Sequence, residues 1–519
     1  MKKMWAIPVL AAVMAIGATG CGSSDGSIDQ NGANVFPVSS VEDNLPIAMG
    51  DVMPFYDNGV MNIYHLQDSG SSPFYHPISR LTTTDFIHYT DEGIAIKYAE
   101  GTDAIKSNDA ALGTGSFIKD AASGKYHCFY TGHAASVDDV YPDPLEVIRH
   151  ATSDDQKTWV KEESFKIKGN SETDSLNNDF RDPYVYFDSH DNCYYMLVTA
   201  RDKIDGIESG VIKYYSSSSL DAAADGWHYE GIFYDNPEAT YNMECPSIVE
   251  LNGYYYLAFS EQGDNRVTHY LYKSSQNRSS REGEWSKFER DSIDAGGFYA
   301  GRLEKAGEKL FAFAWCARLS GGVSGGFDWG GSLVTHELVQ NSETGELSAV
   351  MPQSYKNFFS HEVTLNTVDG ESISDFDFDG EKFSAHGMQQ LSTNVLRISL
   401  KIEAKGESGD FGLSFGLDGN YNNRLGSAII AFELEKGKVT CYNGVSSILR
   451  YGAPLTSVAF DFEKDKSYNA DIIVDGEILT VYLNSEIALT ARITDMKESN
   501  FAFYSNGAKA KIQDIKFYE

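Results

Sequence analysis

The feature that most constrains the fold is a hairpin pattern that recurs five times between residues 50 and 350. In each copy, two short runs rich in Tyr, Phe and Val flank a polar turn, and the pattern returns after roughly 50–70 residues, as propeller blades do. Asn58-Gly59 and Asn252-Gly253 stand in two of these turns, and Asn-Gly is the strongest short-range hairpin signal. The five hairpins begin near Met53, Ser116, Pro183, Pro246 and Phe298.

This repeat predicts an all-β fold with a five-bladed β-propeller over residues 46–355. No long amphipathic helical stretch interrupts the copies. A pair of β-sandwiches with coincidental hairpins is the alternative for the same strand spacing. Residues 356–519 lose the repeat but keep alternating strands, for example at 396–402 and 468–474, so we expect a C-terminal β-sandwich there.

The N-terminus has the order of a bacterial secretory signal. Met1-Lys2-Lys3 precedes an apolar stretch that is too short to span a bilayer, and Ala18-Thr19-Gly20-Cys21 follows. Small residues ending in Cys resemble a lipobox, so residues 1–21 are predicted to be a lipoprotein signal peptide with Cys21 lipidated. A simple removed signal is the alternative. Residues 22–45 are predicted to be a flexible tether, and the protein is expected to be secreted and anchored to a membrane by lipid, at the cell surface or the periplasmic face.

Charge and cysteine content exclude several classes of partner. The chain has 75 acidic and 42 basic residues, a net charge of −33, which repels phosphate backbones, so nucleic-acid binding is not expected. Its six cysteines form no C-x-x-C pair, and no cluster of metal-ligand residues stands out, so no disulfide framework, metal or cofactor is predicted. No obligate protein partner is predicted. A neutral polysaccharide or oligosaccharide is compatible with this surface.

Three acidic residues stand just before the first strand of a repeat: Asp51, Asp182 and Glu244. Aligning the repeats places all three at the same position, and such positions converge at the central channel of a propeller. Carboxylates gathered at one mouth raise one another's pKa, which lets one act as an acid while another stays ionised. Glycoside cleavage needs that pair. Asp57 lies in a hairpin turn and is expected to be structural, and a loop or cap role is the open alternative for Asp51.

The motifs around these acids resemble glycoside hydrolase family 32, the fructan hydrolases and invertases. Phe180-Arg181-Asp182-Pro183 is similar to the family's Arg-Asp-Pro motif, and Met243-Glu244-Cys245-Pro246 to its Glu-Cys motif. The first motif departs from the family's usual Asn-Asp-Pro-Asn-Gly: this chain has Gly50-Asp51-Val52-Met53-Pro54, so the acid is kept and the flanking Asn residues are not. Segments 113–116, 329–338 and 474–492 extend the resemblance over residues 50–519.

The resemblance implies a retaining double displacement on β-fructosidic linkages of levan, inulin or sucrose-type substrates. It makes Asp51 the nucleophile, Glu244 the acid and then the base, and Asp182 the stabiliser of the transition state, with Arg181 beside it. Retention then implies about 5–5.5 Å between the nucleophile and acid carboxyls. By their places in the matching motifs, Ser116 and Trp329 would line the sugar pocket, with strand packing as the alternative for each. The resemblance thus implies three substrate-binding residues, Arg181, Ser116 and Trp329.

Other functions stay open from the sequence. One is an inverting propeller hydrolase on arabinose- or xylose-containing glycans, and another is a catalytically decayed, glycan-binding surface lipoprotein, which the missing Asn residues favour. Fructosyl transfer is a third, because a sugar can take the covalent intermediate instead of water. The anomeric configuration of the first product separates retention from inversion. The sandwich is expected to pack against the propeller rather than to bind glycan.

Overall fold

The computed structural model describes residues 34–42, 45–68, 76–100, 107–134, 144–169, 179–236, 241–263, 266–319, 327–373, 375–380, 382–389, 395–417, 425–444, 451–493 and 500–519. The predicted signal peptide with Cys21, and residues 22–33 of the predicted tether, lie outside these ranges. Within them, no helix has both the length and the apolar character needed to cross a membrane.

The first part of the chain consists of antiparallel strands in sequence order. These strands are β1 (Ser40–Glu42), β2 (Leu45–Ile47), β3 (Met49–Asp57), β4 (Val60–Gln67), β5 (Ile78–Thr83), β6 (Tyr89–Ile96), β7 (Ala111–Lys119), β8 (Tyr126–His133), β9 (Glu146–Ser153), β10 (Val160–Lys161), β11 (Ile167–Lys168), β12 (Phe180–Asp188), β13 (Cys193–Ile204), β14 (Ile207–Ser217), β15 (His228–Asp235), β16 (Asn242–Leu251), β17 (Tyr254–Gln262), β18 (Thr268–Ser274), β19 (Tyr299–Ala306), β20 (Lys309–Leu319), β21 (Phe327–Gln340) and β22 (Leu347–Val350). A 3₁₀ turn, Ala224–Gly226, precedes β15.

Tight turns join the first two strands of two sheets, β3 to β4 and β16 to β17, as the sequence predicts. Asn58 and Gly59 between β3 and β4 have φ of 51° and 86°, and Asn252 and Gly253 between β16 and β17 have φ of 45° and 86°. Two consecutive residues with positive φ make a turn whose twist matches that of paired strands, and Asn-Gly adopts it at low cost. The local turn chemistry therefore sets the register of these hairpins.

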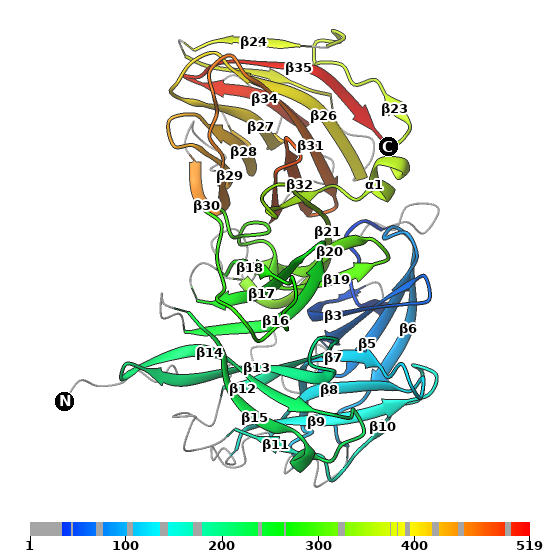
Figure 1. Ribbon diagram of the computed structural model, residues 1–519. Helices are drawn as coiled ribbons and strands as arrows, with labels where there is room; N and C mark the ends of the chain where they lie inside the picture. Colours follow the sequence, from blue (N-terminus) through cyan, green and yellow to red (C-terminus); the bar gives the residue numbers. More distant parts are fainter. Residues whose placement is uncertain are drawn as a thin grey trace, which may run out of the picture.

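The sheets are arranged around a common axis. Their orders are β7-β8-β9-β10, β12-β13-β14-β15 and β16-β17-β18, and a larger sheet joins β19-β20-β21 to β3-β4-β5-β6 through one residue pair, Gly331 with Met49. The first strand of each run contacts the next in the order β3, β7, β12, β16, β19, and β19 contacts β3 again. These innermost strands close a ring, as in a propeller (Figure 1).

The second part of the chain contains a short helix, α1 (Gln353–Phe358), and two further sheets. Their strands are β23 (Glu362–Val363), β24 (Phe376–Asp379), β25 (Phe383–Gly387), β26 (Val395–Ala404), β27 (Asp410–Leu417), β28 (Ala428–Glu433), β29 (Lys438–Gly444), β30 (Tyr451–Ala459), β31 (Ser467–Asp475), β32 (Ile478–Leu483), β33 (Ile487–Arg492), β34 (Asn500–Asn506) and β35 (Lys509–Tyr518). One sheet has the order β23-β35-β26-β31-β32-β33 and the other β25-β34-β27-β28-β29-β30. Alternate residues along β26 and β35 are buried, as expected for strands with one face against a core.

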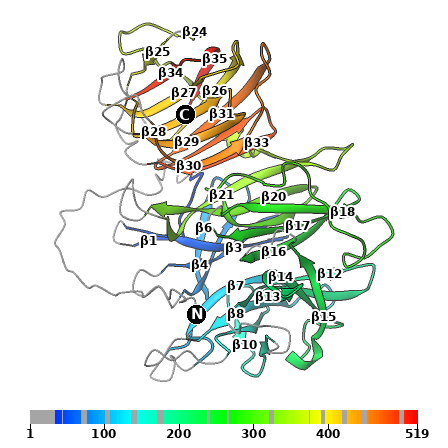
Figure 2. The same ribbon diagram turned by 90° about the vertical axis from the view of Figure 1, so that its left-hand side faces the viewer.

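The sandwich is stacked on one side of the propeller in both views (Figures 1 and 2). Apolar residues of β31 and β32, such as Ile473 and Ile478, belong to the same core cluster as propeller residues. Arg492 of β33 reaches into the propeller, where its Nε donates to the carbonyl oxygen of Ala317 at 2.8 Å. The two parts are therefore joined by apolar packing and by a buried polar anchor.

Candidate active site

A β-bulge interrupts every innermost strand near the same depth. The register with the neighbouring strand shifts between the following residues: Gly50 and Met53, Gly113 and Gly115, Arg181 and Tyr184, Glu244 and Ser247, and Tyr299 and Arg302. Within four of these bulges a residue other than glycine has a positive φ: Asp51 (37°), Asp182 (57°), Cys245 (55°) and Ala300 (55°). Bulges re-aim side chains, and such backbone strain gathers at functional sites.

The predicted alignment of the three acids is wrong for Glu244. Asp51 and Asp182 are the positive-φ residues of their strands, whereas Glu244 stands one residue before the positive-φ residue of β16. Glu244 therefore occupies the position that Arg181 has on β12 and Tyr299 has on β19. The sequence alignment placed the three acids at one position, but on β16 the acid stands one residue before the backbone position that Asp51 and Asp182 occupy on their strands.

All three acids nevertheless line one pocket of about 220 Å³, together with Arg181 and Trp329. Other lining residues include Thr114, His76, His133 and Glu146. Only 3% of the surface of Asp182 is exposed, and 14% of the Glu244 side chain. Within the ranges that the structure describes, no group of three or more His, Cys, Asp or Glu side chains is arranged to hold a metal ion.

Both carboxylate oxygens of Asp51 accept hydrogen bonds from side chains far away in the sequence. The Thr114 hydroxyl donates to Oδ2 at 2.6 Å, and Nε1 of Trp315 donates to Oδ1 at 3.0 Å. Burial raises the pKa of Asp51; these two donors oppose the rise, and the negative charge of Glu244 adds to it. The carboxylate is thus fixed in orientation at both oxygens.

Glu244 is held from both sides by residues at its own position on neighbouring strands. Nη2 of Arg181 donates to Oε1 at 2.8 Å, and the Tyr299 hydroxyl donates to Oε2. Burial and the charge of Glu244 raise the pKa of Tyr299, so this phenol stays a neutral donor. Because equivalent positions on adjacent innermost strands face one another, the row Arg181, Glu244, Tyr299 follows from the shared bulge.

Asp182 is bound by the bulge of the next innermost strand. Its Oδ2 accepts the backbone N–H of Cys245 at 2.9 Å and the Thr199 hydroxyl at 3.3 Å. Burial raises the pKa of Asp182, the guanidinium of Arg181 opposes this, and the charge of Asp51 adds to it. Asp51 and Asp182 therefore influence each other's ionisation across the pocket.

Two more acids, which sequence reasoning missed, fix the orientation of Arg181. Nη1 of Arg181 donates to Asp179 Oδ1 at 2.8 Å and to Glu146 Oε2 at 3.2 Å. Burial raises the pKa of Glu146 to about 7, although Arg181 and the Phe180 N–H oppose the rise. Asp179 lies two residues before Arg181, but nothing local connects Glu146 of β9 to this motif.

The prediction that Ser116 lines the sugar pocket is not met in the structure. Ser116 is 4% exposed and lies outside the pocket lining, where its hydroxyl accepts the Val185 N–H at 2.9 Å. The bulge of β7 brings Thr114, two residues earlier, to Asp51 instead. Ser116 has the strand-packing role that was its alternative.

Trp329 forms one wall of the pocket, and its ring leaves room only for glycine at position 50, before Asp51. The Trp329 residue is 37% exposed, and its ring lies 4.1 Å from that of His76 between centroids. A Cβ atom on Gly50 would come within 2.4 Å of the Trp329 ring. Any side chain at position 50, Asn included, would displace this tryptophan, so Gly50 and Trp329 are a matched pair.

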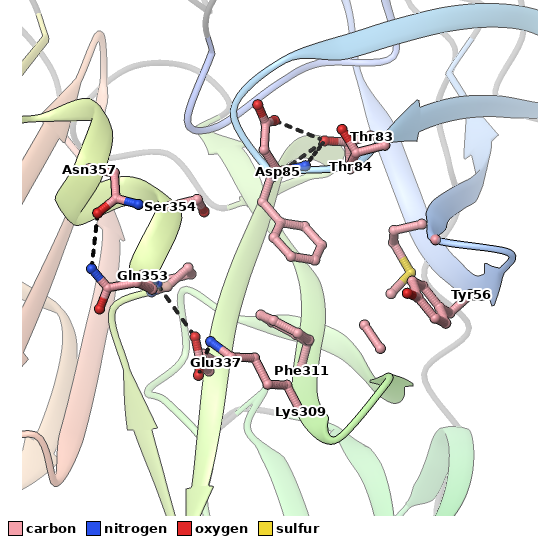
Figure 3. Close-up of a pocket in the computed structure, with 15 residues that line it drawn as sticks. Tyr56, Thr83, Thr84, Asp85, Lys309, Phe311, Glu337, Gln353, Ser354 and Asn357 are labelled. Carbon is pink, nitrogen blue, oxygen red and sulfur yellow. Dashed lines mark hydrogen bonds and ion pairs between the residues drawn. The ribbon is translucent and has the colours of Figure 1, made fainter.

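A larger cavity, of about 360 Å³, lies away from the three acids, between the β3–β4 hairpin, β20 and α1. Figure 3 shows Asp85 and Glu337 on opposite sides of it. Glu337 pairs with Lys309 at 2.8 Å, and Asp85 accepts hydrogen bonds within its own turn, from Ile87 N at 2.9 Å and His88 N at 2.8 Å. The acids of this larger cavity are thus paired with nearby residues, and the size of a cavity alone does not identify the active site.

Comparison with known proteins finds a family that matches most of the chain. The model of the glycosyl hydrolases family 32 N-terminal domain matches residues 55–331, and that of the family 32 C-terminal domain matches residues 352–519. A levanbiose-producing levanase of Geobacillus stearothermophilus is 29% identical over 38% of this chain and 44% of its own length. A sucrose-6-phosphate hydrolase of Vibrio alginolyticus is 27% identical over 40% of this chain and 37% of its own length. The aligned region thus spans less than half the length of these curated relatives.

Solved structures resemble the whole fold. A sucrose-6-phosphate hydrolase from Lactobacillus gasseri has a TM-score of 0.65 at 20% identity, covering 91% of each chain. Fructan 1-exohydrolase IIa from Cichorium intybus has a TM-score of 0.66 at 14% identity, covering 92% of this chain and 98% of its own. At these identities the likeness shows the fold, and the predicted all-β architecture of a propeller followed by a sandwich is confirmed. Together with two family models that match most of its length, this shows that the chain belongs to glycosyl hydrolases family 32.

Proposed function

We propose that the protein is a retaining glycoside hydrolase that cleaves β-fructosidic linkages in fructans such as levan and inulin, or in sucrose-type substrates. The observation that carries the proposal is one pocket in which Asp51, Asp182 and Glu244 stand in different hydrogen-bonding environments. Two carboxyl groups in different environments are what glycoside cleavage requires. Family membership and the names of the relatives support the fructosyl linkage.

In the proposed first step, Asp51 attacks the anomeric carbon of the fructosyl unit. The bond from that carbon to the leaving oxygen breaks, and Glu244 gives its proton to this oxygen. The donors Thr114 and Trp315 keep both oxygens of Asp51 in a fixed orientation before the attack. Fixed orientation before the reaction removes part of its entropic barrier.

In the second step, Glu244 takes a proton from water, and this water displaces Asp51 from the anomeric carbon, so that the configuration is retained. Arg181 and Tyr299 hold Glu244 in place through both steps. Asp182 binds sugar hydroxyls beside the reacting carbon, and the flat face of Trp329 packs against the sugar. A sugar acceptor in place of water would give fructosyl transfer from the same intermediate.

The test is product analysis of the purified protein on levan, inulin, sucrose and arabinan. We expect fructose or short fructans from at least one of the first three, and NMR at early times should show the β-anomer of the released unit first. Glu244→Gln should abolish this release. An α-anomer as the first product, or cleavage of arabinan alone, would favour the inverting alternative, and no release from any of the four would favour a glycan-binding protein.

We also propose that the protein is exported and held at a membrane by lipid on Cys21. The basic start, the short apolar stretch and the small residues before Cys21 support this. Cys21→Ser should move the protein from the membrane fraction of its bacterial host to the soluble fraction. An unchanged distribution would leave a simple removed signal or another form of retention as the explanation.

A further inference from the structure

Beneath the pocket, the innermost strands place a second ring of side chains around the axis. On β3, β12, β16 and β19 its members stand two residues after the positive-φ position, and β7 contributes Ser116. Two hydrogen bonds join neighbouring strands at this level: Val185 N of β12 donates to Ser116 Oγ at 2.9 Å, and Leu303 N of β19 donates to Ser247 Oγ at 3.0 Å. The lower ring consists of Met53, Ser116, Tyr184, Ser247 and Arg302.

Arg302 is the charged member of the lower ring, and it crosses the axis. Its Nη1 donates to the carbonyl oxygen of Gly115 on β7 at 2.6 Å, although β3 lies between β19 and β7 in the ring of strands. Its guanidinium carbon lies 5.5 Å from the centre of the Tyr184 ring, and 1% of the residue is exposed. The side chain therefore extends below the pocket floor rather than outward to solvent.

Two of the donor atoms of Arg302 are unpaired. Among the residues that the structure describes, Nε and Nη2 have no hydrogen-bond partner. Burying a cation with unsatisfied donors costs several kcal/mol, on the order of the cost of an unpaired buried polar group or more. A cation kept in such a place needs a compensating attraction, and the nearest source is the acidic pocket above it.

The groups that face Asp51 and Asp182, counted together with these two aspartates, include four carboxyls and two arginines. They are Glu244 and Cys245 of β16, Arg181 of β12, Glu146 of β9, His76, His133 of β8 and Arg302 of β19. Of the two arginines, Arg181 is already engaged by Glu244, Glu146 and Asp179. The charge of Arg302 acts on both aspartates and lowers the pKa of each against the effect of burial.

We propose that Arg302 is a positioning residue of this active site, which stabilises the ionised carboxylates of Asp51 and Asp182 from beneath the pocket while its Nε and Nη2 bind water in the channel. This inference rests on the proposed function, because it assigns the ionised nucleophile to Asp51. Arg302 does not touch substrate. It acts by making a strained, buried pair of aspartates available as anions at the pH where the enzyme works.

The test compares the pH dependence of kcat/KM in three variants. Arg302→Met keeps the bulk and removes the charge, so the acidic limb of the profile should move to higher pH by about one unit, a loss of about tenfold on that limb. Arg302→Lys keeps the charge, and its acidic limb should stay close to that of the parent. Arg80→Met is the matched control, since Arg80 is also buried, at 5% exposed, but pairs with Glu92 at 3.3 Å on the outer strands.

An acidic limb that stays in place in Arg302→Met, or one that moves equally in Arg80→Met, would overturn the proposal. Thermal unfolding of each variant shows that folded protein is being compared. If Arg302→Met does not fold, Arg302→Gln replaces it, because its amide can still donate to Gly115 and it also lacks the charge. Asp51→Asn separates the two proposals: an active Asp51→Asn refutes the assigned nucleophile, whereas an inactive one with an unmoved limb in the uncharged variant refutes only the role of Arg302.

Discussion

The axis of the propeller and the interior of the sandwich use buried space in opposite ways. The sandwich encloses a large apolar cluster, with Phe411, Leu413 and Phe503 fully buried. The propeller places its apolar clusters between sheets and leaves charged side chains, such as Asp182 and Arg302, around its axis. A buried charge destabilises the fold unless it is paired. The difference teaches that the stability and the chemistry of this protein are carried by separate regions, which mutations can test.

The largest effect is expected at the axis. Asp51→Asn removes the proposed nucleophile, so kcat should fall by about a thousandfold or more, while the melting temperature should stay the same or rise, because a buried carboxylate is lost. Asp57→Asn is the matched control on the same strand, since Asp57 lies outside the pocket lining, where it pairs with Lys119 at 3.2 Å and accepts hydrogen bonds from Asn58 at 3.0 Å and Tyr126 at 2.8 Å. Its kcat should equal that of the parent. Comparable losses in both variants would mean that the strand, not the carboxylate, matters.

The next effect is expected in the sandwich. Phe503 is fully buried against Phe376 and Phe501, so Phe503→Ala should lower the free energy of unfolding by about 3–5 kcal/mol. The kcat per folded molecule should not change, measured well below the melting temperature. Phe187→Ala, at a residue 47% exposed, should change stability little. A large drop in kcat for Phe503→Ala would break the separation between the two regions.

A smaller effect on activity is expected from Tyr299→Phe. This change removes the hydroxyl that donates to Glu244 but keeps the ring that packs edge-on against Trp315, 5.5 Å away between centroids. Losing one hydrogen bond to a charged group should lower kcat by about tenfold. Tyr186→Phe, which loses a hydrogen bond with Ser280 of the loop after β18 at 2.7 Å, is the control and should affect only stability. Equal kcat in Tyr299→Phe and the parent would remove Tyr299 from the site.

The smallest effect is expected on the free energy of unfolding, from a single acid of the propeller whose contribution depends on pH. Glu304 is half-buried, and burial raises its pKa from the ordinary 4.5 to about 8, against the Tyr56 N–H and the charge of Lys305. Between these two pKa values the folded state keeps a proton that the unfolded state has lost, so stability falls as pH rises through this window. Glu304→Gln should therefore be more stable than the parent by about 1 kcal/mol at pH 8 and equal below pH 4.5.

Urea unfolding at several pH values measures this difference. Glu308→Gln, in the exposed turn after β19, provides the control and should follow the parent at every pH. A Glu304→Gln variant that is less stable than the parent at pH 8 would show that the carboxylate makes a favourable interaction that outweighs its burial.

The parts of the fold that the sequence predicts are those with local causes. Asn-Gly turns and alternating strands predict the hairpins because turn geometry and strand pairing involve residues close in the chain. Asp51 and Asp182 could be found from their place beside the predicted hairpin strands, although the structure puts both inside strands, β3 and β12. The partners that define their chemistry could not: Trp315 lies 264 residues from Asp51, and Glu146 lies 35 residues from Arg181. No local sequence pattern predicts contacts between residues so far apart in the chain.

The bulges explain why two predictions about the site, the position of Glu244 and the role of Ser116, are wrong. An extra residue shifts every side chain beyond it, so an alignment that places the three acids at one position misplaces Glu244 by one residue. On β7 the same feature brings Thr114, rather than Ser116, to the pocket. Bulges leave no clear trace in composition or periodicity, because their residues here are as different as Asp51 and Ala300.

The repeated bulge also bears on how this pocket could be given a different chemistry. Cys245 and Ala300 have a positive φ, as Asp51 and Asp182 do, yet neither side chain is used in the proposed reaction. Because the main chain adopts this shape with Asp, Cys and Ala side chains, the scaffold tolerates exchange at these points. Substitutions at Cys245 and Ala300 could therefore introduce new catalytic groups one at a time without changing the backbone of either strand.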